Sequence, residues 1–318
     1  MAGYLLLLPL CFAVGLLWAP WLIERLHELR FGKRIRLEGQ EHHLAKEGTP
    51  TMGGWLFVLT SAAAMALFVR EPRVVVPVAG GMLLFALFGA LDDYANIKNR
   101  EGLGLHVHVQ IVVQLLLSLA VGAALYGLYR VDRLDVPGLG TVALGGLMIP
   151  FAALVVFATS TAANIIDGLD GLAAGTVALA LTAYLVIAYR AGDGPLVGAG
   201  AAFIGALLAF LWFNVNPASL FMGGTGSMAL GAGLATVALL SGQSLLLPLI
   251  AALLVVSLGS SVLQTTYYKL THGKRIFRRA PFHHHLELSG WPEVQIVFRF
   301  WLIAALCAAL GVILAETT

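Results

Sequence analysis

Two adjacent carboxylates, Asp92 and Asp93, have the clearest chemical potential in the chain, and they follow a long apolar run. Neighbouring carboxylates repel each other unless a cation or a single proton relieves them. A hard divalent cation such as Mg²⁺ prefers oxygen ligands and keeps several waters while it binds phosphates. The pair therefore predicts a metal-dependent phosphate site, and the alternative is an ordinary solvent-exposed acidic pair at a helix end.

A second polar group, Asn164, Asp167 and Asp170, has the spacing i, i+3, i+6. If this segment is helical, the three side chains share one face, and Gly168 and Gly171 allow a ligand to approach the backbone closely. Polar side chains at the end of an apolar span favour a lined cavity. Asp170 could also simply cap the next helix, and the two roles are compatible.

Residues 214–227 form a Gly-rich segment that starts with Asn214 and contains Phe221. Backbone amides of such a loop, together with a helix N-terminus, favour anions. The ring of Phe221 could stack on a nucleotide base. The alternative is a flexible loop with a lipid-facing phenylalanine, because a Gly-rich loop alone is a weak signal.

Two basic segments complete the candidate chemistry. Residues 43–54 contain Lys46, which could meet a phosphate as a point charge, although a basic loop beside lipid headgroups has the same composition. Residues 274–287 place His283, His284 and His285 after a run of cations. Adjacent side chains rarely face one ion, so we expect phosphate binding or acid–base chemistry rather than metal binding. The alternative is a basic interfacial helix.

The elements that position these residues must lie in a membrane. Of the 318 residues, 59% are hydrophobic and 11% are charged, whereas soluble domains carry roughly 25% charged residues. We therefore predict a single all-α polytopic membrane domain over residues 1–318, with a short β-hairpin in residues 131–145 around a Pro-Gly turn. The predicted spans are residues 4–23, 51–69, 74–91, 107–129, 147–163, 172–190, 196–213, 227–241, 244–266 and 296–315.

Positive charge predicts the orientation of these spans. Of the 19 lysines and arginines, 14 lie in loops 24–46, 98–100 and 269–279 or at Arg299, and 5 lie on the opposite side. The positive-inside rule makes the first side cytoplasmic. All five motifs then face the cytoplasm, and both termini and the hairpin face the periplasm. Cys11 and Cys307 lie in apolar runs and predict neither a disulfide framework nor a metal motif.

Together the motifs resemble those of the phospho-N-acetylmuramoyl-pentapeptide transferases, within the polyprenyl-phosphate sugar-1-phosphate transferases. The resemblance covers about residues 36–301. Its most specific string is Ala-Pro-Phe-His-His-His-Leu-Glu-Leu at residues 280–288, and the others are residues 46–54, 92–94, 164–171, 221–227 and 290–301.

The resemblance implies ten spans in the bacterial inner membrane and transfer of phospho-MurNAc-pentapeptide from UDP-MurNAc-pentapeptide to undecaprenyl phosphate. The products would be lipid I and UMP, with Mg²⁺ as cofactor. By position, Asp92 and Asp93 would serve the metal, the phosphates and deprotonation of the lipid phosphate, with Lys46 among the catalytic residues. The nucleotide would contact Asn164, Asp167, Asp170, Asn214 and Phe221, and the sugar-phosphate side would contact His283, His284 and His285.

Two departures from the family strings touch the phosphate region. The family reads Phe-Met-Gly-Asp-Thr-Gly-Ser where this chain has Gly224 in place of the aspartate, which is expected to bind Mg²⁺. The family also carries lysines where this chain has His106 and His108. A second hypothesis is therefore a catalytically impaired relative that still binds nucleotide-sugar or polyprenyl phosphate.

Other partners and functions are less favoured. A transporter is disfavoured because the acids lie at span ends on one side and no inverted repeat is visible. Membrane lipid is an expected partner and nucleic acid is not. The sequence leaves the oligomeric state open, with a homodimer among the states that it allows.

Overall fold

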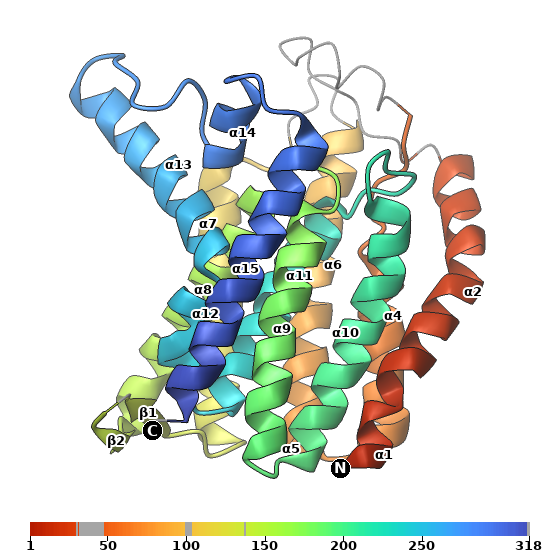
Figure 1. Ribbon diagram of the computed structural model, residues 1–318, viewed down its shortest axis with the longest axis vertical. Coiled ribbons are helices and arrows are strands. Elements are labelled where there is room, and N and C mark those ends of the chain that lie inside the picture. Colours follow the sequence, from red (N-terminus) through yellow and green to blue (C-terminus); the bar gives the residue numbers. More distant parts are fainter. Residues whose placement is uncertain (30, 32–47, 99–103, 137, 317–318) are drawn as a thin grey trace.

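The computed structural model describes residues 1–29, 31, 48–98, 104–136 and 138–316. Long helices run side by side between two ends of a bundle (Figure 1). Both termini lie at one end, called the terminal end here, and the short helix α14 (Phe282–Glu287) lies at the other, called the site end. The remaining helices are α1 (Ala2–Leu5), α2 (Leu7–Glu28), α4 (Trp55–Ala64), η1 (Met65–Val69), α5 (Pro72–Val75), η2 (Val76–Gly80), α6 (Gly81–Lys98), α7 (Val107–Gly127), η3 (Gly145–Leu147), α8 (Met148–Ile166), α9 (Leu172–Arg190), α10 (Gly194–Asn214), α11 (Gly223–Leu240), η4 (Ser244–Leu246), α12 (Leu247–Ile250), α13 (Ala252–Leu270) and α15 (Glu293–Ala315).

The predicted helical membrane architecture agrees with the described residues. Eight of their helices are long and apolar enough to cross a membrane, and the bent pair Ser244–Ile250 and Ala252–Leu270 makes up to nine. The shorter apolar helix Trp55–Val69 occupies the remaining predicted interval. Each predicted span thus overlaps an apolar helix, while the exact number of spans and the compartment of the termini stay predictions.

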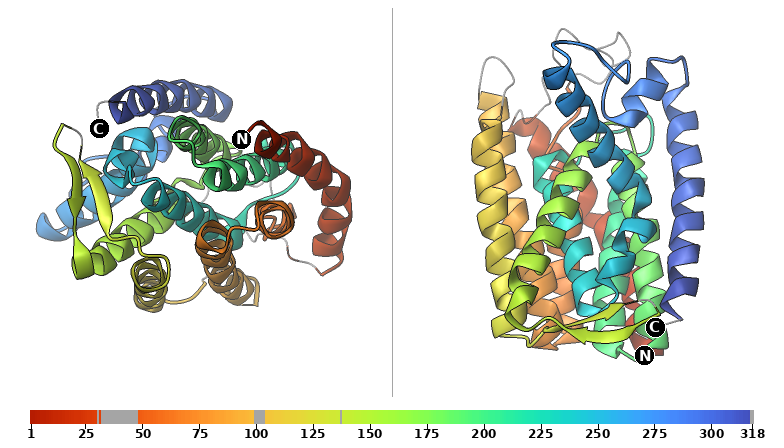
Figure 2. Two further views of the ribbon diagram at one scale, coloured as in Figure 1. Left: turned by 90° about the horizontal axis from the view of Figure 1, so that it is seen from below. Right: turned by 90° about the vertical axis from the view of Figure 1, so that its left-hand side faces the viewer.

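Helices α10 and α11 lie in the interior of the bundle, and α2 and α15 lie at its edge (Figure 2). Small residues allow this close packing: the backbone of α11 at Gly231 contacts residues Thr159 and Ser160 of α8, where an added Cβ would clash. The Ser160 hydroxyl donates to the carbonyl of Met228 at 3.1 Å. Without water, helices associate through such close contacts and interhelical hydrogen bonds.

The predicted hairpin is confirmed. Strands β1 (Arg133–Val136) and β2 (Gly140–Ala143) pair antiparallel, while Pro137 lies outside the described residues. The backbone amide of Asp135 donates to the carbonyl of Gly242 at 3.1 Å, and Gln243 Nε2 donates to the Asp135 carboxylate at 3.3 Å. These bonds fasten the hairpin to the terminal end of α11, away from the chemistry-bearing motifs.

Candidate active site

The acidic pair lies near the site end of α6, where its two carboxylates have different partners. Asp92 Oδ1 accepts hydrogen bonds from the backbone amide of Leu105 at 2.7 Å and from Gln110 Nε2 at 2.9 Å. The Asp93 carboxylate accepts from the amides of Gly224 and Thr225 at 2.8 and 2.9 Å and from the Thr225 hydroxyl at 2.6 Å. The pair is therefore fixed on both sides rather than displayed freely to water.

The Gly-rich start of α11 donates hydrogen bonds to the protein's own Asp93, and its binding of a ligand anion stays a prediction. A helix N-terminus carries unpaired amides and a partial positive charge, which stabilise a carboxylate. The amides of Gly224 and Thr225 are consequently engaged by the Asp93 carboxylate.

Gly224 lies beside both acids, in surroundings that leave little room for a side chain. A Cβ atom at this position would lie 3.3 Å from Asp93 Oδ1, 3.4 Å from the Gly89 carbonyl oxygen and 3.7 Å from Asp92 Oδ2. Three oxygen atoms therefore face one point, and oxygen is the donor type that a hard divalent cation takes. Within the described residues, no group of three or more His, Cys, Asp or Glu side chains could hold a metal ion.

Asn164, Asp167 and Asp170 do not share one helical face, because the segment is not helical throughout, as that arrangement would require. Helix α8 ends at Ile166, and Asp167 has ψ of 57°, outside the helical range. A short turn leads to Gly171, whose φ of +78° suits glycine. Asn164, still in the helix, accepts a hydrogen bond from the Ser227 hydroxyl at 2.8 Å, which joins α8 to the acidic region through α11.

Asp170 and Asn214 are buried and support neighbouring loops. Asp170 Oδ2 accepts from Asn216 Nδ2 at 3.1 Å and from the amide of Ala218 at 3.2 Å. Asn214 accepts from the amide of Gly171 at 3.1 Å and donates to the carbonyl of Leu220 at 2.9 Å. Both side chains therefore shape the backbone around the half-buried Asp167.

Phe221 lies where the Gly-rich segment meets residues 50–54. Its amide donates to the carbonyl of Pro50, and its carbonyl accepts from the amide of Gly53, both at 2.8 Å. The amide of Gly54 donates to the Met222 carbonyl at 3.1 Å. These bonds bring two of the predicted motifs together, although Lys46, the catalytic candidate of the first motif, lies outside the described residues.

The three histidines on α14 have three different environments. His283 is fully buried, and its two ring nitrogens have no hydrogen-bond partner among the described residues. His284 Nδ1 lies 2.9 Å from a Glu287 carboxylate oxygen. His285 Nδ1 accepts from the amide of Arg278 at 3.2 Å.

The histidines approach the turn after α8 through Gly168. A Cβ atom at Gly168 would lie 2.6 Å from His283 Nε2 and 3.0 Å from His284 Nε2, so only glycine fits without displacing the rings. Burial, the neighbouring His284 and the cation of Arg279 lower the pKa of His283 to about 3, against an opposing effect of Glu287. His283 is therefore neutral at physiological pH.

The motifs form one connected region at the site end. Asp93 bonds to Thr225, Ser227 bonds to Asn164, and Gly168 meets His283. Sequence reasoning missed four of the residues that hold this region together, namely Gln110, Asn216, Thr225 and Glu293. For Glu293, an acid in the first turn of the last span was the available signal.

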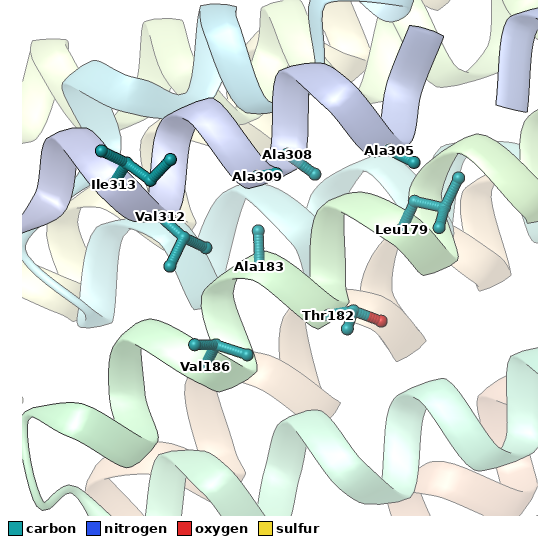
Figure 3. Close-up of a pocket in the computed structure, with 9 residues that line it drawn as sticks. All are labelled: Leu179, Thr182, Ala183, Val186, Ala305, Ala308, Ala309, Val312 and Ile313. Carbon is teal, nitrogen blue, oxygen red and sulfur yellow. The ribbon is translucent and has the colours of Figure 1, made fainter. Parts of the chain in front are cut away.

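An apolar groove between α9 and α15 lies apart from this region (Figure 3). Its volume is about 390 Å³. The hydroxyl of Thr182 in its wall donates to the carbonyl of Ala178 at 2.8 Å. A groove so poor in polar groups does not fit phosphate chemistry. Its lining residues are Leu179, Thr182, Ala183, Val186, Ala305, Ala308, Ala309, Val312 and Ile313.

The chain is similar to known proteins that share one name and to one family model. Residues 75–242 match the family described as "Glycosyl transferase family 4". The chain is 44% identical to a phospho-N-acetylmuramoyl-pentapeptide-transferase of Heliobacterium modesticaldum, with 95% of each chain covered. It is 40% identical to the protein of that name from Chloroflexus aurantiacus, with 99% of this chain and 90% of the relative covered. A third, from Desulforapulum autotrophicum, is 38% identical over 95% of this chain and 88% of the relative.

Proposed function

Because this chain belongs to the family of phospho-N-acetylmuramoyl-pentapeptide-transferases, we propose that it transfers phospho-MurNAc-pentapeptide from UDP-MurNAc-pentapeptide to undecaprenyl phosphate. An oxygen of the lipid phosphate forms a bond to the sugar-linked phosphorus. The bridging P–O bond of the UDP group breaks, and its electron pair leaves with UMP. The lipid product is lipid I, an intermediate of peptidoglycan synthesis.

The observation that carries this proposal is the arrangement of Asp92, Asp93 and Gly224. Phosphoryl transfer needs positioning and charge stabilisation more than covalent chemistry from the protein. Asp92 Oδ2 and Asp93 Oδ1 face one point beside Gly224, and these two oxygens would hold Mg²⁺. Bound there, the cation would offset the negative charge of the reacting phosphates.

The two acids differ in what else they can do. Asp93 is held by three donors, so its role is to fix the start of α11 and to face the metal. Asp92 uses Oδ1 for its two hydrogen bonds, while its Oδ2 accepts none among the described residues. Asp92 Oδ2 is therefore the oxygen of the pair that is most available to the cation, and removal of the proton from the lipid phosphate is not assigned to one of the two acids.

The remaining candidates surround the other parts of the substrates. Phe221, Asn164 and Asp167 would contact the nucleotide, while Asp170 and Asn214 would keep that side of the site in shape through their loop hydrogen bonds. The three histidines would contact the sugar-phosphate side, with neutral His283 able to donate from one ring nitrogen and accept at the other. Lys46 would add a cation near the phosphates.

The orientation follows from charge. We place the site end at the cytoplasmic face of the bacterial inner membrane, where the excess of lysine and arginine lies, with ten spans and both termini in the periplasm. This orientation gives the site access to a water-soluble UDP-sugar and to a lipid phosphate in the same leaflet.

A second candidate function is binding without turnover, and Gly224 is the observation that favours it. The space beside the two acids lacks the carboxylate that the family resemblance places there, so one negative charge toward the cation is missing. Such a protein would bind UDP-MurNAc-pentapeptide or undecaprenyl phosphate and release no UMP.

One assay separates the two functions. Purified protein is incubated with UDP-MurNAc-pentapeptide and undecaprenyl phosphate across a Mg²⁺ titration, and UMP and lipid product are both measured. The transferase proposal expects equal amounts of the two products, rising with Mg²⁺. No product from the native chain at any Mg²⁺ concentration, with activity gained in Gly224→Asp, would contradict the transferase proposal and favour binding without turnover.

A further inference from the structure

The end of α13 and the start of the following loop, residues 267–276, form a cationic segment that we call the basic arm. It carries Lys269, Lys274 and Arg275, all exposed. The sequence has no aspartate or glutamate between Asp193 and Glu287, so no acid of its own neighbourhood in the chain offsets this charge.

The basic arm also exposes apolar and aromatic side chains. Leu270 is 75% exposed, and Tyr268 and Ile276 are 46% and 44% exposed. The Arg275 guanidinium lies 5.9 Å from the ring centre of Tyr268. Cations beside exposed tyrosines and aliphatic residues are typical of segments at the headgroup level of a membrane.

The direction of α13 carries the basic arm away from the rest of the bundle. Helix α13 bends by 78° from the segment Ser244–Ile250, and its far end projects away from the other helices at the site end (Figure 1). Lys269 lies in the last turn of this apolar helix, where a spanning helix reaches the boundary between hydrocarbon and water.

We propose that the basic arm binds anionic phospholipid headgroups in the leaflet on the site side. Charge complementarity selects this occupant, because an anionic leaflet attracts cationic segments near its surface. The exposed Leu270 and Ile276 favour a lipid surface over a fully hydrated polyanion, since both can enter the region below the headgroups.

Hydrogen bonds connect the basic arm to the histidines. Gln264 Oε1 on α13 accepts from the amides of Ile276 and Phe277 at 3.1 and 3.0 Å. The amide of Phe282, the first residue of α14, donates to the Ser260 hydroxyl at 3.0 Å. The loop therefore folds back along α13, and headgroup binding would set the position of α14. This inference concerns lipid binding and holds whether or not the chain turns over substrate.

Hydrogen–deuterium exchange tests the proposal on the full chain in nanodiscs. One set contains phosphatidylcholine only, and the other contains equal parts of phosphatidylcholine and phosphatidylglycerol. Residues 267–276 are expected to exchange several-fold more slowly in the anionic discs. High salt should remove this difference, because the screening length falls from about 10 Å at 0.1 M to about 3 Å at 1 M.

Two triple variants test which cations are responsible. Lys269→Gln/Lys274→Gln/Arg275→Gln should lose the protection given by anionic lipid, and Arg70→Gln/Arg73→Gln/Arg133→Gln, at the terminal end, should keep it. Exchange in the buried helix α10 checks that each variant is folded, and the salt titration of the native chain needs no variant.

Three results would overturn the proposal. The first is equal exchange of the native chain in the two kinds of disc at low salt. The second is retained protection in the Lys269 triple variant. The third is equal protection from inorganic pyrophosphate in phosphatidylcholine discs, which would make the basic arm a site for soluble phosphates.

Discussion

Glu293 accepts a hydrogen bond from the backbone amide of Asp170 at 2.7 Å, although 123 positions separate them in the sequence. Its other carboxylate oxygen accepts from Asn216 Nδ2 at 3.3 Å, and that amide also donates to Asp170 at 3.1 Å. One side chain at the start of α15 therefore joins the turn after α8 to the loop after α10. It positions these loops without being one of the candidate catalytic groups.

Replacing Glu293 should loosen both loops. Glu293→Ala removes two acceptors, and a hydrogen bond to a charged group contributes about 1.5–3 kcal/mol. We expect faster hydrogen exchange in residues 167–171 and 214–221 and a higher KM for UDP-MurNAc-pentapeptide, with a smaller change in kcat. Glu293→Gln keeps one acceptor and should fall between the native chain and the alanine variant.

Glu28→Ala is the matched control, because Glu28 is exposed at the same end of the bundle and, among the described residues, pairs only with its neighbour Arg25. If Glu293→Ala and Glu28→Ala had the same small effect on loop exchange and KM, Glu293 would have no positioning role.

Contacts between residues far apart in the sequence, such as this one, could not be predicted from the sequence. Apolar runs predicted where helices lie, and the Pro-Gly turn predicted the hairpin, because both signals are local. The partner of Asp170 could not be predicted, since the contact with Glu293 depends on how α15 packs. The same limit applies to Asp93: its motif and the Gly-rich segment were both recognised, but not that the amides of Gly224 and Thr225 would bind it.

The glycines in residues 167–171 explain why this segment is not helical. The spacing of Asn164, Asp167 and Asp170 suits a helix, yet α8 ends at Ile166. Gly168 and Gly171 explain the difference, since glycine destabilises helices and permits the left-handed conformation found at Gly171. Residues 167–171 therefore form a turn that contacts the histidines of α14.

Gly224→Asp should make stability depend on divalent cations. The position accepts a Cβ atom with only small shifts, at 3.3 Å from Asp93 Oδ1 and 3.4 Å from the Gly89 carbonyl oxygen. A third carboxylate beside Asp92 and Asp93 adds repulsion, so the variant should have a lower Tm than the native chain in EDTA. Mg²⁺ should raise the Tm of the variant more than that of the native chain.

Gly146→Asp is the control for this substitution, because nothing lies within 4 Å of its Cβ position at the terminal end. An equal effect of Mg²⁺ on the Tm of both variants would mean that the space beside Gly224 does not bind the cation.

His283 should make the protein sensitive to acid. Its pKa is lowered to about 3 from an ordinary 6.5, so between these values the unfolded chain binds a proton that the folded chain does not. The free energy of unfolding then falls as the pH drops from about 6.5 toward 3, by at most about 1.4 kcal/mol per pH unit. Chemical denaturation across this range measures the slope.

His283→Leu should flatten this pH dependence without destabilising the protein at pH 7, because the buried ring nitrogens have no partner to lose among the described residues. His27→Leu, at an exposed position of α2, should keep the native profile. An unchanged acid slope in His283→Leu would show that another group causes it.

Thr225→Val should weaken the anchor of Asp93. Valine keeps the shape of the side chain but removes the hydroxyl that donates to Asp93 at 2.6 Å. The loss should cost about 1–3 kcal/mol of stability, seen as a lower Tm. Thr236→Val is matched to it: Thr236 is buried in the same helix, and within the described part of the chain its hydroxyl donates only to the carbonyl of Ala232. Equal Tm values for the two variants would contradict this role of Thr225.

If Asp93 and its neighbours at the start of α11 serve phosphosugar transfer, removing the Asp93 charge should slow the reaction, and one rate comparison tests this. Asp93→Asn is measured beside Asp193→Asn for lipid I and UMP formation at saturating Mg²⁺. Asp193 caps α10 by accepting from the amide of Leu196, a role that asparagine fills equally well. We expect Asp93→Asn to lower kcat by about 100-fold or more and Asp193→Asn to keep the native rate. Native turnover in Asp93→Asn would contradict this expectation.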